Sequence, residues 1–110
     1  MDNRQRIFNM IGLATKAGKT VSGEFSTEKA VKSGKASVVI VSEEASANTQ
    51  KMFTNMCTYY KVPIYIFGKK GELGSSMGKE MRASLAILDD GLAEAVVKQM
   101  NINGGSKYES

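Results

Sequence analysis

The segment Ser37-Val38-Val39-Ile40-Val41-Ser42 indicates the architecture of this 110-residue chain. Its four consecutive apolar residues are all β-branched, which predicts a strand because branched side chains pack well on a pleated sheet. Polar residues do not alternate with the apolar ones, so we expect both faces of the strand to be buried. A strand of this kind lies in a sheet that helices cover on both sides.

The chain around this strand alternates between helical and extended segments. Apolar residues recur with helical spacing over residues 4–17, 24–33, 48–60 and 90–100, and residues 69–77 predict a short helix or turn. The spacing predicts inward faces at Thr27, Ala30 and Val31 of the second helix and at Met52, Phe53, Met56, Cys57 and Tyr60 of the third. Residues 62–67 and 84–88 are apolar runs typical of buried strands, and residues 20–22 are a short extended piece. The alternation predicts an α/β fold built as a three-layer α/β/α sandwich.

Composition limits the domain organisation and the chemistry of the chain. We expect one domain over residues 1–100 and a flexible tail over residues 101–110, which are rich in Asn, Gly and Ser. The chain has no histidine, the commonest general base and zinc ligand, and its single Cys57 cannot form a Cys-rich metal site. We therefore expect no metal and no cofactor. Without an apolar run of roughly 18–20 residues or a signal peptide, we expect a cytoplasmic protein with no membrane contact.

Enzyme motifs fail on spacing and context. Gly-Lys-Thr at residues 18–20 resembles the end of a phosphate-binding loop, but five residues instead of four separate Gly12 from Gly18, and the motif closes a helix instead of opening one. The acidic pairs at residues 43–44 and 89–90 are typical of helix caps and turns. We expect no enzyme, with lysine or carboxylate chemistry in a pocket of perturbed groups as the open alternative.

The positive charge lies in the first two-fifths of the chain. Residues 1–42 carry seven Lys and Arg against three Asp and Glu, a net +4, whereas residues 43–110 carry eight of each. Lysines surround a predicted helix that Gly23 precedes, and a helix N-terminus favours a phosphate. A second candidate is the loop at residues 78–83, where Met81 is available to an unstacked base. Alternatively, Gly23 and Gly78 are turn glycines and the lysines are merely solvated.

At these residues the sequence resembles the kink-turn-binding ribosomal protein superfamily, which includes the archaeal box C/D protein, and in particular its small bacterial branch called YlxQ-type. The resemblance covers residues 4–100 in several short segments with similar spacing. The matching segments are residues 11–19, 23, 29–34, 38–46, 48–49, 62–63, 72–74, 78–79 and 86–89. It implies a four-stranded mixed sheet and non-enzymatic binding of structured RNA, either ribosome-associated or non-coding, with a kink-turn-like element.

The family motif Gly-x-Asn-Glu-x-x-Lys opens the second helix, and its Asn, Glu and Lys read the sheared G·A pairs of a kink-turn. Gly23 and Lys29 match this motif, whereas Phe25 stands at the Asn position and Ser26 at the Glu position. Phe25 has no side-chain hydrogen bond to offer, so it either stacks on a base or packs inward. Arg82 replaces a more neutral residue in the covering loop, which shifts binding toward the RNA backbone.

These considerations predict an RNA-binding surface with three parts. The contact surface comprises Gly23, Glu24, Phe25, Ser26 and Lys29. Phosphates are expected at Lys16, Lys19 and Lys32, and a covering loop at Lys79, Met81, Arg82 and Ala83. RNA is the expected partner, together with ribosomal proteins. The alternative is a protein-interaction module that uses the same edge without binding RNA, which would show little dependence on salt.

Overall fold

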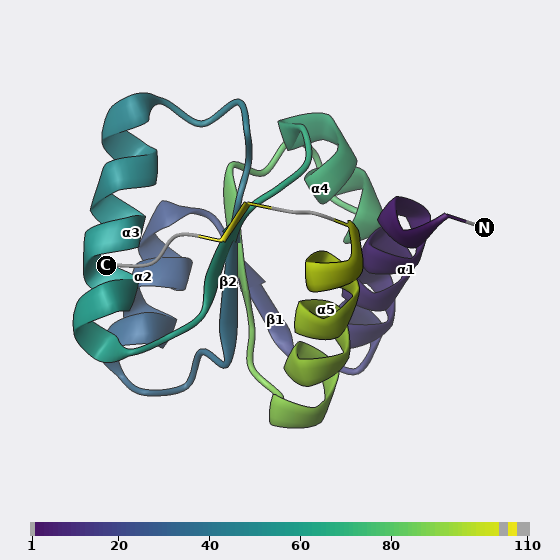
Figure 1. Ribbon diagram of the computed structural model, residues 1–110, viewed down its shortest axis with the longest axis horizontal. Helices are drawn as coiled ribbons and strands as arrows, with labels where there is room; N and C mark the ends of the chain where they lie inside the picture. Colours follow the sequence, from purple (N-terminus) through teal and green to yellow (C-terminus); the bar gives the residue numbers. More distant parts are fainter. Residues whose placement is uncertain (1, 104–105, 108–110) are drawn as a thin grey trace.

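The computed structural model describes residues 2–103 and 106–107, which form five helices and five strands. In Figure 1 a central sheet separates α2 and α3 on one side from α1, α4 and α5 on the other. The helices are α1 (Asn3–Lys16), α2 (Glu24–Lys32), α3 (Ala47–Tyr60), α4 (Lys70–Ser76) and α5 (Asp90–Asn103). The strands are β1 (Thr20–Ser22), β2 (Val38–Val41), β3 (Ile64–Ile66), β4 (Ser84–Ile87) and β5 (Ser106–Lys107). The three-layer α/β/α sandwich is confirmed.

The sheet has the strand order β1-β4-β2-β3-β5. β2 pairs in parallel with β3, while β4 pairs antiparallel with both β1 and β2, so the predicted four-stranded mixed sheet is confirmed. The two-residue β5 adds a fifth, antiparallel strand beside β3. α5 continues to Asn103, so the predicted domain boundary at residue 100 lies inside a helix. The rest of the tail predicted for residues 101–110 is described only at β5; residues 104–105 and 108–110 lie outside the described residues.

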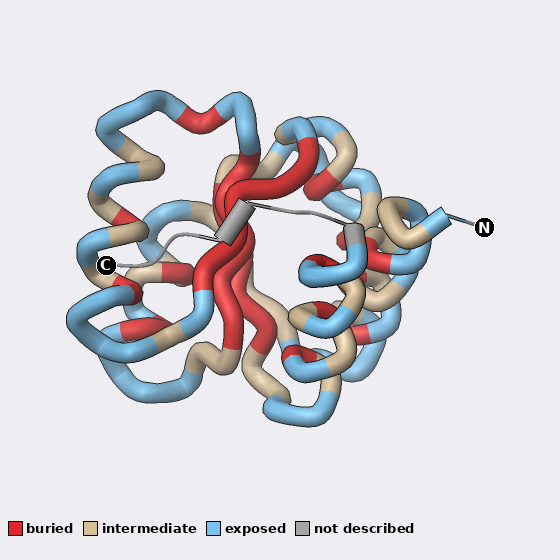
Figure 2. Tube along the Cα trace, in the orientation of Figure 1, coloured by how far each residue is buried: buried red, intermediate tan, exposed pale blue. Residues whose placement is uncertain are grey.

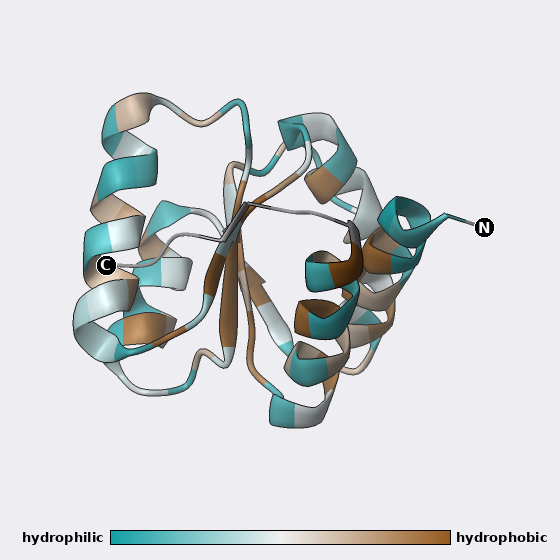
Figure 3. Cartoon of the chain, viewed as in Figure 1, coloured by the Kyte–Doolittle hydropathy of each residue, from teal (hydrophilic) through white to brown (hydrophobic). Residues whose placement is uncertain are grey.

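The core lies on both sides of β2. Val38 and Ile40 belong to the cluster shared with α1 and α5, whereas Val39 and Val41 belong to the cluster shared with α2 and α3. All four side chains are fully buried, which confirms burial on both faces. The strands β2, β3 and β4 are the most buried part of the described chain and are largely apolar, and polar residues lie on the outer helix faces (Figures 2 and 3).

The helices bury the faces that their periodicity predicts. Ile7, Ile11 and Ala14 of α1 are buried, as are the three inward residues of α2, Thr27, Ala30 and Val31. In α3 the predicted inward face includes Phe53 and Cys57, which are fully buried. Tyr60 has the same spacing but is 40% exposed, so the last turn of α3 departs from the predicted pattern.

The paired acidic residues stabilise backbone turns, as the sequence predicted. Glu43 accepts a hydrogen bond from the Gly68 N–H at 2.7 Å, and Glu44 accepts one from the Lys70 N–H at 2.9 Å. Both contacts fix the turn that leads from β3 into α4. Asp89 accepts from the N–H of Leu92 at 2.9 Å and so caps α5.

Candidate nucleic-acid interface

The N-terminus of α2 lies at the edge of the sheet and carries no side-chain cap. Gly23 precedes it with φ +91° and ψ 159°, a conformation that favours glycine. The Gly23 N–H donates to the Ser84 carbonyl at 2.9 Å, and the Gly23 carbonyl accepts from the Thr27 N–H at 3.0 Å. The N–H groups of residues 24–26 therefore have no partner within the helix, and the space beside the Gly23 Cα is open. Such N–H groups suit an anionic ligand.

The loop at residues 78–83 is held against α4. The Lys79 N–H donates to the Gly74 carbonyl at 2.9 Å, and the Arg82 N–H donates to the Lys70 carbonyl at 3.0 Å. A Cβ atom at Gly74 would lie 1.7 Å from the Glu80 carbonyl oxygen, so only glycine permits this approach. The loop consequently has one backbone position relative to α4.

A side-chain hydrogen bond joins this loop to the start of α2. The Arg82 Nε donates to the Ser22 Oγ at 2.9 Å, and a terminal nitrogen of Arg82 donates to the Met81 carbonyl at 3.0 Å. β1 pairs with β4 so that Ser22 lies opposite Leu85. The pairing of β1 with β4 thus brings together the two segments that the sequence predicted as one surface.

The side chains of this surface differ in exposure. Phe25 is 78% exposed and Met81 is 67% exposed, whereas Arg82 and Ala83 are half-buried. Glu24, Lys29 and Lys79 are exposed and Ser26 is half-buried. Phe25 does not pack inward, so the second of its two predicted arrangements is excluded. A shallow hollow beside the loop is lined by Gly71, Lys79, Glu80, Met81 and Arg82.

Of the three predicted phosphate-binding lysines, Lys16 and Lys19 are not brought to this surface, whereas Lys32 lies on α2 itself. Lys16 ends α1, on the other side of the sheet from α2 (Figure 1). Lys19 precedes β1, at the opposite end of that strand from Gly23, about 13 Å away at 3.3 Å per residue. Lys32 donates to Glu28 at 2.6 Å and is partly neutralised by that ion pair. Lys29 is left as the unpaired cation on α2 among the described residues.

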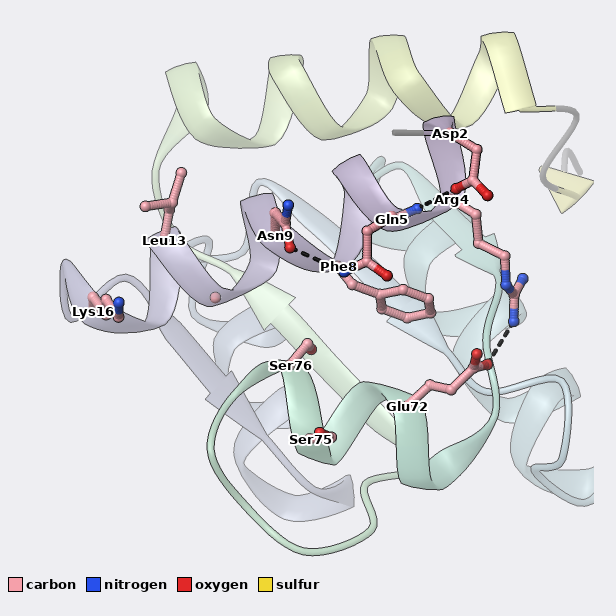
Figure 4. Close-up of a pocket in the computed structure, with 11 residues that line it drawn as sticks. Asp2, Arg4, Gln5, Phe8, Asn9, Leu13, Lys16, Glu72, Ser75 and Ser76 are labelled. Atoms are coloured by element: carbon pink, nitrogen blue, oxygen red, sulfur yellow. Dashed lines mark hydrogen bonds and ion pairs between the residues drawn. The ribbon is translucent and has the colours of Figure 1, made fainter.

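A groove of about 770 Å³ lies on the opposite side of the sheet, between α1 and α4 (Figure 4). Its charged side chains have structural partners. Arg4 forms an ion pair with Glu72 and lies over the ring of Phe8, while Asp2 caps α1 by accepting from the Gln5 N–H. Figure 4 shows Lys16 at the far end of α1 from this pair. The acids of the groove are therefore engaged in holding α1 and α4.

Metal ligation and membrane insertion find no support in the described chain. Within residues 2–103 and 106–107, no three or more His, Cys, Asp or Glu side chains are grouped so that they could hold a metal ion. Over the same residues, none of the helices combines the length and apolar character needed to cross a membrane.

The ribosomal protein L7Ae/L30e/S12e/Gadd45 family model matches residues 5–97. The chain belongs to this family. A similar relative is RNA-binding protein YlxQ of Bacillus subtilis, which is 39% identical over 86% of this chain and 94% of its own. Large ribosomal subunit protein eL30 of Candida albicans is 37% identical over 81% of this chain and 86% of its own. Family membership confirms the resemblance read from the sequence, and these family and relative names are not names of enzymes.

The family fold is also seen among solved structures. A protein of unknown function from Bacillus halodurans C matches with a TM-score of 0.84 and 28% identity, over 86% of this chain and 96% of that one. The match supports the strand order and the placement of the helices described above.

Two residues of the surface were missed in the sequence. Gly74 fixes the loop through its contact with Glu80, and Ser22 accepts the hydrogen bond from Arg82. The one available signal for Gly74 was its place in a segment that matches the family, at residues 72–74. Ser22 gave no signal, because its partner lies sixty residues away.

Proposed function

We propose that this protein binds structured RNA, without catalysing a reaction, through the N-terminus of α2 and the loop at residues 78–83. The observation that carries the proposal is the hydrogen bond from Arg82 to Ser22, which holds the loop beside the uncapped start of α2. Membership of a family of ribosomal proteins supports it, as does the relative named RNA-binding protein YlxQ.

The chemistry of the surface fits a folded RNA. The free N–H groups that follow Gly23 suit a phosphate, and the exposed Lys29 and Lys79 supply cations from α2 and from the loop. Phe25 and Met81 offer exposed apolar surface to unstacked bases. Arg82 has a further role, because its hydrogen bonds to protein groups position the loop while it adds a positive charge to the surface.

The RNA that we propose contains a kink-turn-like element and belongs to the ribosome or to a non-coding RNA. The resemblance to eL30, a large ribosomal subunit protein, supports ribosome association and hence a cytoplasmic location. Phe25 and Ser26 lack the base-reading groups of the family motif. Recognition therefore relies on stacking by Phe25 and on backbone contacts more than on base edges.

The test is a fluorescence titration with two RNA duplexes. One carries a kink-turn with tandem sheared G·A pairs, and the other replaces those pairs with Watson–Crick pairs. We expect the kink-turn duplex to bind more tightly, with an affinity that falls steeply as salt rises. Crosslinking in cells followed by sequencing then identifies the natural RNA. Absence of binding to both duplexes, together with no enriched RNA from cells, would contradict the proposal.

The exposed side chains of Phe25 and Met81 also favour a second candidate, a protein partner that docks on the same edge. Salt distinguishes the two candidates. Contact with several phosphates gives a steep loss of affinity between low and moderate salt, whereas an apolar protein interface changes little.

A further inference from the structure

The outer face of α2 extends away from the proposed RNA site. Phe25, Lys29 and Lys32 are spaced four and three residues apart, so they lie on one exposed face of this nine-residue helix. Seven residues separate Phe25 from Lys32, about 10 Å along the helix axis. A shallow hollow of about 390 Å³ along this face is lined by Phe25, Glu28, Lys29, Lys32 and Ser33.

Two tyrosines lie at the far end of this face. Tyr59 and Tyr60 are the last residues of α3, which ends at Lys61 in a left-handed conformation. β1 and β2 are both antiparallel to β4, so α2 and α3, which follow them, run in the same direction and pack together. Their C-terminal ends are therefore neighbours.

Lys32 and Tyr60 are the last residues of the neighbouring helices α2 and α3. The pKa of Lys32 is raised, first by its hydrogen bond to the Glu28 carboxylate and, more weakly, by electrostatic interaction with Tyr60. The tyrosine at the end of α3 thus continues the face that begins at Phe25.

The aromatic residues of this face differ in exposure, and Tyr60 is the most buried of them, at 40% exposed. Tyr59, like Phe25, is 78% exposed, and the rings of Tyr59 and Tyr60 meet edge to face with centroids 4.9 Å apart. The exposed rings of Phe25 and Tyr59 offer the larger share of aromatic surface to a ligand. Exposed aromatic groups gathered along one surface mark an interaction site.

The chemistry of the face favours a single-stranded nucleic acid. Lys29, Lys32 and Lys61 outnumber Glu28, so the surface is net positive and complements a phosphate backbone. Aromatic rings interspersed with cations are the arrangement on which successive bases stack. A double helix hides the faces of its bases, so these rings can stack only on an unpaired strand.

We propose that Phe25, Tyr59 and Tyr60, with Lys29 and Lys61, form a stacking strip for a single-stranded RNA segment. This segment flanks the structured element bound at the start of α2, so the inference rests on the proposed function. It assigns a role to the end of α3 that the proposed structured-RNA site does not require.

The experiment compares three fluorescent probes: the blunt kink-turn duplex, and the same duplex with an oligouridine extension of about ten nucleotides at either the 5′ or the 3′ end. We expect one extension to tighten binding by the wild type at least tenfold, about 1.4 kcal/mol. Tyr59→Ala with Tyr60→Ala removes that gain and leaves the affinity for the blunt duplex unchanged. Tyr59→Phe with Tyr60→Phe retains the gain, because the stacking rings remain.

Leu13→Ala is the matched control, since Leu13 is also exposed, at 60%, but lies on α1 across the sheet. We expect it to retain the gain. Three outcomes would overturn the stacking strip while leaving the proposed function intact. Neither extension tightens binding, the gain in affinity survives in the alanine variant, or the phenylalanine variant loses the gain as fully as the alanine variant does. If the blunt duplex itself does not bind, the proposed function fails. The stacking strip is then tested separately, by titrating the wild type and the tyrosine variants with free oligouridine. Binding that needs the tyrosine rings supports the strip, and no binding overturns it.

Discussion

Arg82 and Ser22 are sixty residues apart, yet the Arg82 Nε donates a 2.9 Å hydrogen bond to the Ser22 Oγ. The bond joins the loop at residues 78–83 to the last residue of β1, directly before Gly23. The position of the loop relative to α2 therefore depends on a polar contact between two side chains, as well as on the sheet.

Ser22→Ala removes the hydroxyl acceptor and keeps every charge. We expect the RNA affinity to fall about threefold, because the loop loses one constraint, and the free energy of unfolding to fall by about 0.5–1.5 kcal/mol. Titration and chemical denaturation measure the two effects. Ser37→Ala is the control, because the Ser37 hydroxyl also takes part in a hydrogen bond with a distant side chain, donating to Asp90 at 2.6 Å. The Ser37→Ala variant should lose stability and keep its affinity for RNA. Equal RNA affinity of the two variants would refute the role of Ser22.

Lys29→Glu combined with Arg82→Glu reverses two charges at the proposed interface. We expect RNA binding to weaken at least tenfold, about 1.4 kcal/mol, with the fold retained, since Lys29 is exposed and Arg82 is half-buried. The control, Arg6→Glu with Lys98→Glu, makes the same charge change at exposed positions of α1 and α5. An equal loss of affinity in the control would show that only net charge matters.

Gly74→Ala tests the loop without touching any side chain of the interface. The added Cβ would meet the Glu80 carbonyl at 1.7 Å, so the loop must move or the fold must lose about 1–3 kcal/mol. We expect RNA affinity to fall at least fivefold by titration, about 1 kcal/mol. Gly91→Ala, in α5, adds a Cβ that meets only the Asp89 carboxylate at 3.4 Å, an ordinary contact, so this variant should keep its affinity. Unchanged binding by Gly74→Ala would mean that the loop does not contact RNA.

Phe25→Asn with Ser26→Glu restores the residues of the family motif. We expect the preference for the kink-turn duplex over the Watson–Crick duplex to rise at least tenfold, because the new side chains can hydrogen-bond to base edges. The ratio of the two dissociation constants is the measurement. A preference that does not change would indicate that the bound RNA has no kink-turn geometry at this helix.

Because of Cys57, we expect the free energy of unfolding to fall at alkaline pH. Burial raises the pKa of its thiol to about 12 from the ordinary 9.0. Between these values the unfolded chain is ionised and the folded chain is not, so stability falls as pH rises above 9, by at most about 1.4 kcal/mol per pH unit. Chemical denaturation at pH 8 and pH 10 should show a larger loss in the wild type than in Cys57→Ala. The same loss in both proteins would contradict the burial of the thiol.

The sequence predicted the elements of this fold and their buried faces well. Helical spacing identified Thr27, Ala30 and Val31 as inward residues, and the β-branched run identified β2. Both signals are local, because periodicity within one element records which face meets the core. The end of α3 departed from this pattern, since Tyr60 is partly exposed where its spacing predicted burial.

The assembly of the candidate site was harder to predict, because it depends on which strands pair. The pairing of β1 with β4 brings residues 78–83 to Gly23, and no local pattern encodes that contact. The same topology sends Lys16 to the other side of the sheet, although it is close to Gly23 in sequence. Charge counted along the chain therefore overstated the number of lysines at one surface.

The contact between Gly74 and Glu80 shows which positions of the loop region can be redesigned and which cannot. Exposed side chains of the loop, such as Lys79 and Met81, can be exchanged to alter ligand preference while the backbone keeps its path. Gly74 offers no such freedom, because every other residue adds the atom that the Glu80 carbonyl excludes. A library that varies the loop and retains this glycine samples new specificities on one unchanged scaffold.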